Sequence, residues 1–117
     1  MCVIINHVTG RADMTESDIQ ALILIYLTSL PDTYAQRQNT GAAHDGRRLV
    51  RYGVPGQGDI LCCMRGRFIE VEVKTKTGRQ SDAQKLRERN ITKAGGLYIL
   101  ARSVDDVRAA LTKAGLL

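Results

Sequence analysis

Two strand-like segments joined by a very short turn constrain this chain most. Asp59–Met64 (DILCCM) is apolar after its first residue, and Arg67–Lys74 (RFIEVEVK) alternates apolar and polar residues. Both patterns are typical of β-strands, and the intervening Arg65-Gly66 favours a β-hairpin. Alternation divides the second strand into two faces: Ile69, Val71 and Val73 on one, and Phe68, Glu70, Glu72 and Lys74 on the other.

The register of this hairpin decides which polar residues meet. If the turn has two residues, Arg65-Gly66 or Gly66-Arg67, Asp59 lies opposite Glu72 or Lys74 and points to the same face. Glu72 and Lys74 already share that face, roughly 7 Å apart along the strand. A three-residue turn would direct Asp59 to the wrong face. We therefore predict one site formed by Asp59, Glu72 and Lys74.

Helix signals surround the hairpin. Thr15 is a predicted N-cap, followed by Glu16 in an acidic first turn and by apolar residues at helical spacing that end before Pro31. The capping-box sequence Ser81–Gln84 begins a second helix that extends to about Ala94. The remaining elements are a strand at Leu97–Ala101, a helix at Ser103–Ala114 and weaker strands at Tyr34–Gln38 and Leu49–Tyr52. This order predicts a mixed α/β fold.

Length and composition set the broad class. The chain has 117 residues, which suits a single domain over residues 1–117, with residues 1–14 as an N-terminal extension. The net charge of +5 suggests a polyanionic partner. Three cysteines, two of them adjacent in an apolar segment, match neither a disulfide framework nor a zinc site. With no signal peptide or membrane-spanning segment, we expect reduced core cysteines in a cytoplasmic protein.

The pairing of two acidic residues has a chemical consequence. Two carboxylates that converge on a half-buried sheet face repel each other unless they are protonated or bind a cation. Hard oxygen ligands without histidine suit Mg²⁺ or Mn²⁺, which polarise phosphate and activate water. A neighbouring lysine would stabilise the developing negative charge. The simpler alternative is a solvated Glu72-Lys74 surface pair.

Three segments of the chain resemble the VRR-Nuc (virus-type replication-repair nuclease) family of the PD-(D/E)xK superfamily. They are residues 53–60 (GVPGQGDI), Glu72-Val73-Lys74, and residues 78–85 (GRQSDAQK), and the likeness extends from about Glu16 to Val107. The resemblance implies a restriction-endonuclease-like α/β core, with a central mixed β-sheet flanked by helices. One departure is Gly58, which stands where the superfamily name has proline.

The same resemblance implies roles for individual residues. Asp59, Glu72, the Val73 backbone carbonyl and Glu16 would bind Mg²⁺ or Mn²⁺, Lys74 would be the catalytic lysine, and Gln84 would join the site. Two of these residues have simpler explanations, because Glu16 can favour its helix N-terminus and Gln84 can complete a capping box. We assign no chemistry to His7 and His44, and we expect Asn39 to order a turn.

A run of basic residues between Lys74 and Lys93 lies beside the predicted site. Such a run is usually a solvated face, but here it favours phosphate contacts. We expect DNA binding by Lys76, Arg79, Lys85 and Arg89. The few aromatic residues give little support for base stacking.

The resulting hypothesis is a metal-dependent, structure-selective DNA endonuclease in a bacterial or phage-infected cell. Standalone members of the family resemble Holliday-junction resolvases, and a two-fold symmetric four-way junction suits a homodimer. The alternatives are a flap or branched-DNA nuclease, a non-catalytic DNA-binding module that retains the fold, and a protein-interaction domain of a repair complex.

Overall fold

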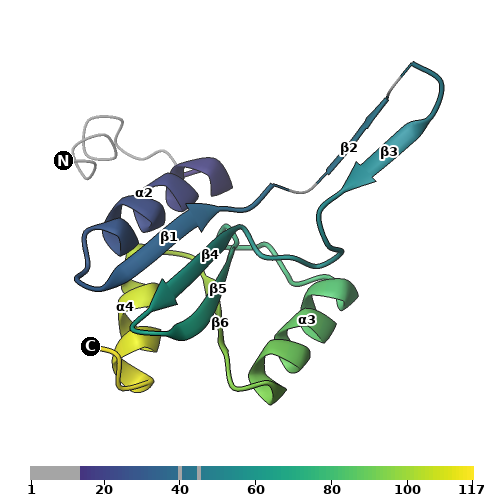
Figure 1. Cartoon of the computed structure of the whole chain (residues 1–117). Helices are drawn as coiled ribbons and strands as arrows, with labels where there is room; N and C mark the ends of the chain where they lie inside the picture. Colours follow the sequence, from purple (N-terminus) through teal and green to yellow (C-terminus); the bar gives the residue numbers. More distant parts are fainter. Residues whose placement is uncertain (1–13, 40, 45) are drawn as a thin grey trace.

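The computed structural model describes residues 14–39, 41–44 and 46–117. Most of the expected N-terminal extension, together with His7 and Cys2, therefore lies outside the described residues. Within them the chain forms three helices and six strands (Figure 1). In chain order these are α2 (Glu16–Thr28), β1 (Thr33–Arg37), β2 (Gly41–His44), β3 (Leu49–Tyr52), β4 (Ile60–Met64), β5 (Arg67–Val73), α3 (Asp82–Lys93), β6 (Leu97–Ala101) and α4 (Val104–Lys113).

The central sheet has four strands in the order β1-β4-β5-β6. β1, β4 and β5 are antiparallel, while β6 is parallel to β5, so the sheet is mixed as predicted. Met64 pairs with Arg67 and Ile60 with Val71, which leaves a two-residue turn of Arg65 and Gly66. Both turn residues have positive φ, 48° and 85°, as the turns of tight hairpins require. The two-residue turn is confirmed, with the first of the two registers considered.

The two faces of this sheet are covered differently (Figure 1). α2 and α4 pack together against one face, where apolar residues from both helices and from β4, β5 and β6 form the core. α3 begins with the capping box of Ser81 and Gln84 and contacts β6 from the other side. The face that carries Glu70 and Glu72 is therefore covered by a single helix.

The smaller features confirm one expectation and correct another. Both predicted weak strands exist, as β1 and β3, and they lie in different sheets. β1 lies on β4, whereas β3 pairs with β2, which the sequence pattern missed, in a separate two-stranded hairpin that projects from the core (Figure 1). Cys62 is buried, but Cys63 is exposed because strand alternation places it on the opposite face, so it is not the core residue we expected. None of the described helices combines the length and apolar character needed to span a membrane.

Candidate active site

Asp59 is held at the junction between a loop and the start of β4. Its backbone N–H donates to the carbonyl of Val71 at 2.8 Å, the residue that pairs with Ile60 at the end of the β4–β5 ladder. Its Oδ2 accepts a hydrogen bond from the Val73 amide at 2.7 Å. The carboxylate therefore reaches across to the backbone of β5, close enough to Glu72 for its charge to raise the pKa of Glu72.

Glu72 is the central side chain of this face and is only 4% exposed. Its Oε2 lies 2.9 Å from Gln84 Nε2 and 3.5 Å from Lys74 Nζ. Its Oε1 is buried and has no hydrogen-bond partner among the residues that the structure describes. One oxygen of Glu72 thus interacts with two donors, and the other has none in the described part of the chain.

The pKa values of both carboxyl groups are raised. The pKa of Glu72 is about 7, raised chiefly by burial and then by the neighbouring Asp59, while Lys74 lowers it. Burial also raises the pKa of Asp59, against the Val73 amide, Lys74 and Arg37, which lower it. Sequence reasoning missed Arg37, which ends β1. The pairing of β1 with β4 places Arg37 opposite Ile60, next to Asp59, and the weak strand pattern of this segment did not predict that pairing.

Glu16 lies at the first position of α2 and is exposed. Its charge raises the pKa of both Asp59 and Glu72, so it faces the site electrostatically. However, within residues 14–39, 41–44 and 46–117 no three His, Cys, Asp or Glu side chains are grouped closely enough to hold a metal ion. The structure brings together Asp59, Glu72, Lys74 and Gln84, and leaves Glu16 at the margin.

These residues fit a divalent cation nonetheless. A buried, unpartnered carboxylate oxygen beside a second carboxylate is the electrostatic arrangement that a cation relieves. Mg²⁺ is commonly bound through one or two carboxylates and keeps several water ligands, so a third side chain is not required. Asp59 and Glu72 supply the side-chain oxygens of this set.

Gln84 makes a capping contact and a contact to Glu72 with the same side chain. Its Oε1 accepts from the Ser81 amide at 2.8 Å, which completes the capping box, and its Nε2 donates to Glu72. The start of α3 is therefore fixed to the acidic centre by the same side chain that caps the helix.

Comparison with known proteins identifies the fold. No protein-family model matches the sequence, and no curated protein matches it. Among solved structures, a chain described as a VRR_NUC domain superposes with a TM-score of 0.58 at 20% sequence identity, over 84% of this chain and 94% of that one. The chain has the fold of a VRR_NUC domain. The predicted restriction-endonuclease-like α/β core, with a mixed sheet flanked by helices, is thereby confirmed.

The predicted DNA-contacting residues lie on the outside of this VRR_NUC fold. Lys76 and Arg79 are exposed in the segment after β5, and Lys85 and Arg89 are exposed on α3. Arg87, which the sequence pattern counted in the same basic run, is different. Its guanidinium makes two hydrogen bonds to the completely buried Glu70, at 2.7 and 3.0 Å. Sequence reasoning missed Glu70, although the spacing of Gln84, Arg87 and Ile91 marks the inner side of α3.

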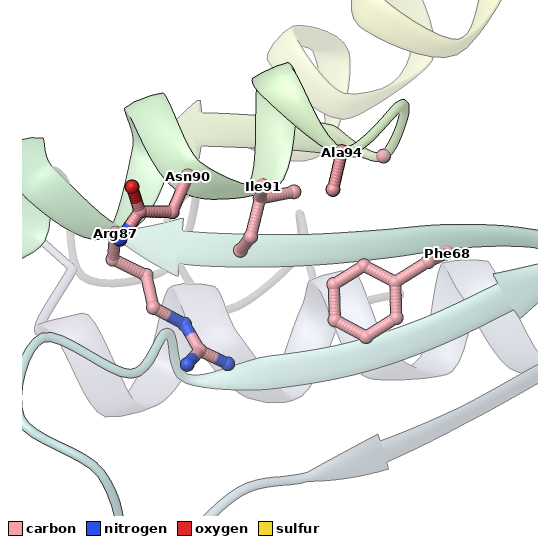
Figure 2. Close-up of a pocket in the computed structure, with 6 residues that line it drawn as sticks. Phe68, Arg87, Asn90, Ile91 and Ala94 are labelled. Atoms are coloured by element: carbon pink, nitrogen blue, oxygen red, sulfur yellow. The ribbon is translucent and has the colours of Figure 1, made fainter.

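A shallow hollow of about 320 Å³ lies between β5 and α3, on the sheet face that carries Glu70 and Glu72. Figure 2 shows Phe68 facing α3 across it, with Ile91 and Ala94 on the helix side and Arg87 extending from the helix toward the strands. Asp59, Glu72 and Lys74 do not line it. The hollow and the acidic centre are therefore separate features of one face.

Proposed function

We propose that this protein is a metal-dependent nuclease that hydrolyses phosphodiester bonds in DNA. The observation that carries the proposal is the state of Glu72, a buried carboxylate with one unpartnered oxygen, next to Asp59 and within 3.5 Å of the Lys74 ammonium. Its position in a VRR_NUC fold supports the same conclusion. Perturbed acids in contact with a lysine are typical of catalytic sites.

The proposed roles follow from the contacts. Asp59 and Glu72, with the Val73 carbonyl and with Glu16 at the margin, would hold Mg²⁺ or Mn²⁺. When bound, this cation supplies Lewis-acid polarisation of the phosphate and a lower pKa for its water. The Lys74 ammonium would donate a hydrogen bond to a phosphate oxygen and stabilise the negative charge that develops there. Gln84 keeps the Glu72 carboxylate oriented through its 2.9 Å hydrogen bond.

The exposed cations beside this centre are proposed to bind the DNA backbone. Lys76 and Arg79 are exposed in the segment after β5, and Lys85 and Arg89 are exposed on α3, the helix whose Gln84 donates to Glu72. Contacts to phosphate fix the register of the duplex without reading its sequence. We therefore propose recognition by DNA shape rather than by base sequence.

We propose branched DNA, and a four-way junction in particular, as the substrate. This follows from the sequence resemblance to the VRR-Nuc family, whose standalone members are similar to junction resolvases. A homodimer would present two sites to the two symmetric strands of such a junction. A flap or another branched duplex would need one site only.

The test is cleavage of labelled duplex, flap and four-way-junction DNA with Mg²⁺, with Mn²⁺ and with chelator. Lys74→Ala and Asp59→Asn are compared with wild type, and Arg108→Ala, in an exposed ion pair on α4, serves as the control. We expect metal-dependent cleavage that both site variants lose and the control keeps. Symmetric junction cleavage supports the resolvase substrate, and flap cleavage alone replaces it. Binding without cleavage under all metal conditions would refute the nuclease.

A further inference from the structure

Glu70 is the most deeply buried charge on the described part of the chain, and it does not belong to the acidic centre. It is 0% exposed, whereas Glu72 is 4% exposed. Its carboxylate is fully engaged: Oε1 and Oε2 accept from the Arg87 guanidinium, and Oε2 also accepts from the Gly58 amide at 2.5 Å. The Arg87 side chain is 25% exposed, but the carboxylate itself has been removed from water, and ion pairs with such a desolvation cost seldom contribute net stability compared with apolar side chains of similar size. Its presence therefore calls for another reason.

Glu70 and the two partners of its carboxylate lie on three different segments. Glu70 is on β5, two residues before Glu72, and Arg87 is on α3, three residues after Gln84. Gly58 is the last residue of the loop that leads into Asp59. One carboxylate thus connects each of the segments that carry Asp59, Glu72 and Gln84.

The packing around Gly58 leaves little freedom at this connection. A Cβ at position 58 would lie 2.8 Å from Glu70 Cγ and 2.9 Å from the Val71 carbonyl oxygen. A proline there would also lack the N–H that Glu70 accepts. The departure from the proline of the superfamily name thus coincides with the Glu70 contact.

The loop has two further attachments that act in the same direction. Gly56 has a φ of 77° and lies so close to α3 that a Cβ would be 2.4 Å from the Ala83 carbonyl oxygen. On the other side, Gln38 Nε2 donates to the Gly58 carbonyl at 3.2 Å. Among these attachments of the loop, the one made by Glu70 involves a charged side chain. The same carboxylate also binds the Arg87 side chain of α3.

We propose that Glu70 is a positioning residue of the active site, whose buried carboxylate aligns the Asp59 loop and the Gln84 helix on the strand that carries Glu72 and Lys74. This inference rests on the proposed nuclease function for its kinetic test. Its structural consequence is independent of cleavage: without Glu70, the Gln84–Glu72 and Val73–Asp59 hydrogen bonds lose their common support.

The decisive variant is Glu70→Met with Arg87→Met, compared with Arg87→Met alone. Removing one partner leaves a buried uncompensated carboxylate and lowers the melting temperature, whereas replacing both by apolar side chains of similar volume restores it. We expect the double variant to recover the melting temperature while kcat on DNA stays on the order of tenfold to a hundredfold low, with KM nearly unchanged. Arg108→Ala should alter none of these quantities.

Recovery of both melting temperature and kcat in the double variant would show that the pair is structural only and would overturn the proposal. A second readout needs no cleavage: the NMR resonances of the Gln84 side-chain amide and the Val73 backbone amide. We expect both to shift in the folded double variant and to stay in place in Arg108→Ala. If wild type cleaves no DNA, the nuclease proposal fails and these resonances alone decide; unshifted resonances would then refute positioning by Glu70.

Discussion

The two faces of the central sheet bury different kinds of side chain. On the face toward α2 and α4, the side chains of β4 and β5 are apolar and almost completely buried: Ile60, Cys62, Met64, Ile69, Val71 and Val73. On the face toward α3, the same two strands bury Glu70 and Glu72, while Phe68 is 41% exposed and Cys63 is exposed. The first face stabilises the fold by removing apolar area from water.

The second face does the opposite, because it removes two carboxylates from water and leaves one oxygen of Glu72 without a partner. Buried charge that is incompletely paired lowers stability. Local violations of the rules for a stable fold are expected at functional sites. The difference between the faces therefore separates the part of the sheet that maintains the fold from the part proposed for catalysis, and each of the following experiments tests that separation.

Glu72→Gln should give the largest effect and should sharpen the contrast. The amide keeps the shape of the side chain but removes the negative charge, so we expect DNA cleavage to fall by at least about a hundredfold. Because an ionised Glu72 is costly beside Asp59, the metal-free variant at pH 8 should be as stable as wild type or more so. Urea unfolding and single-turnover cleavage measure the two quantities. Normal cleavage, or a large loss of stability, would contradict the division.

Leu111→Ala should produce the reverse pattern on the core face. Leu111 on α4 is 0% exposed, and its truncation should lower the free energy of unfolding by about 2–5 kcal/mol. Leu86 on α3 is 50% exposed, so Leu86→Ala is the matched control and should change stability by less than about 0.5 kcal/mol. Cleavage per folded molecule should be unchanged in Leu111→Ala. A kcat loss comparable to that of Glu72→Gln would break the separation.

The core face was also the face that the sequence predicted well. Strand alternation placed Ile69, Val71 and Val73 together, and the two-residue turn set the register that pairs Ile60 with Val71. Both inferences rest on local periodicity, which a short hairpin preserves. The capping signals at Thr15 and Ser81 were local as well, and both are present as capping boxes.

The face toward α3 depends on contacts between distant segments, which periodicity does not report. The Glu70–Arg87 pair joins residues 17 apart, and the Gly58–Glu70 bond joins residues 12 apart. In the sequence, Glu70 reads as one more solvated residue of an alternating strand, and Arg87 as one more member of a basic helix. β2 was missed for a different reason, because its sequence, Gly-Ala-Ala-His, has none of the β-branched or aromatic residues that are typical of strands.

The pH dependence of stability offers a smaller test of the same contrast. The pKa of Glu72 is raised in the folded state from 4.5 to about 7, so the folded protein holds this proton more tightly than the unfolded chain. Its stabilising contribution is complete below pH 4.5 and is lost as the pH rises toward 7, by at most about 3 kcal/mol. Without metal, thermal unfolding should therefore show a falling melting temperature across this window.

Two comparisons control this experiment. Glu72→Gln should flatten the decline, and Leu111→Ala should lower the curve without changing its slope. Mg²⁺ should raise the melting temperature more at pH 8 than at pH 5.5, because the ionised carboxylates bind the cation. A slope that persists unchanged in Glu72→Gln would assign the titration to another group.

Lys85→Ala should have the smallest effect. It tests whether DNA bound at the face toward α3 also contacts the outer surface of that helix. Lys85 is exposed, so its loss should leave stability within about 0.5 kcal/mol. If it contacts one phosphate, the slope of log binding constant against log salt concentration should decrease in magnitude by about 1. Lys113, an exposed lysine at the end of α4 on the core side, is the matched control, and Lys113→Ala should leave the slope unchanged. An equal decrease of the slope in both variants would mean that DNA binding depends on the net charge of the protein and not on the position of the lysine.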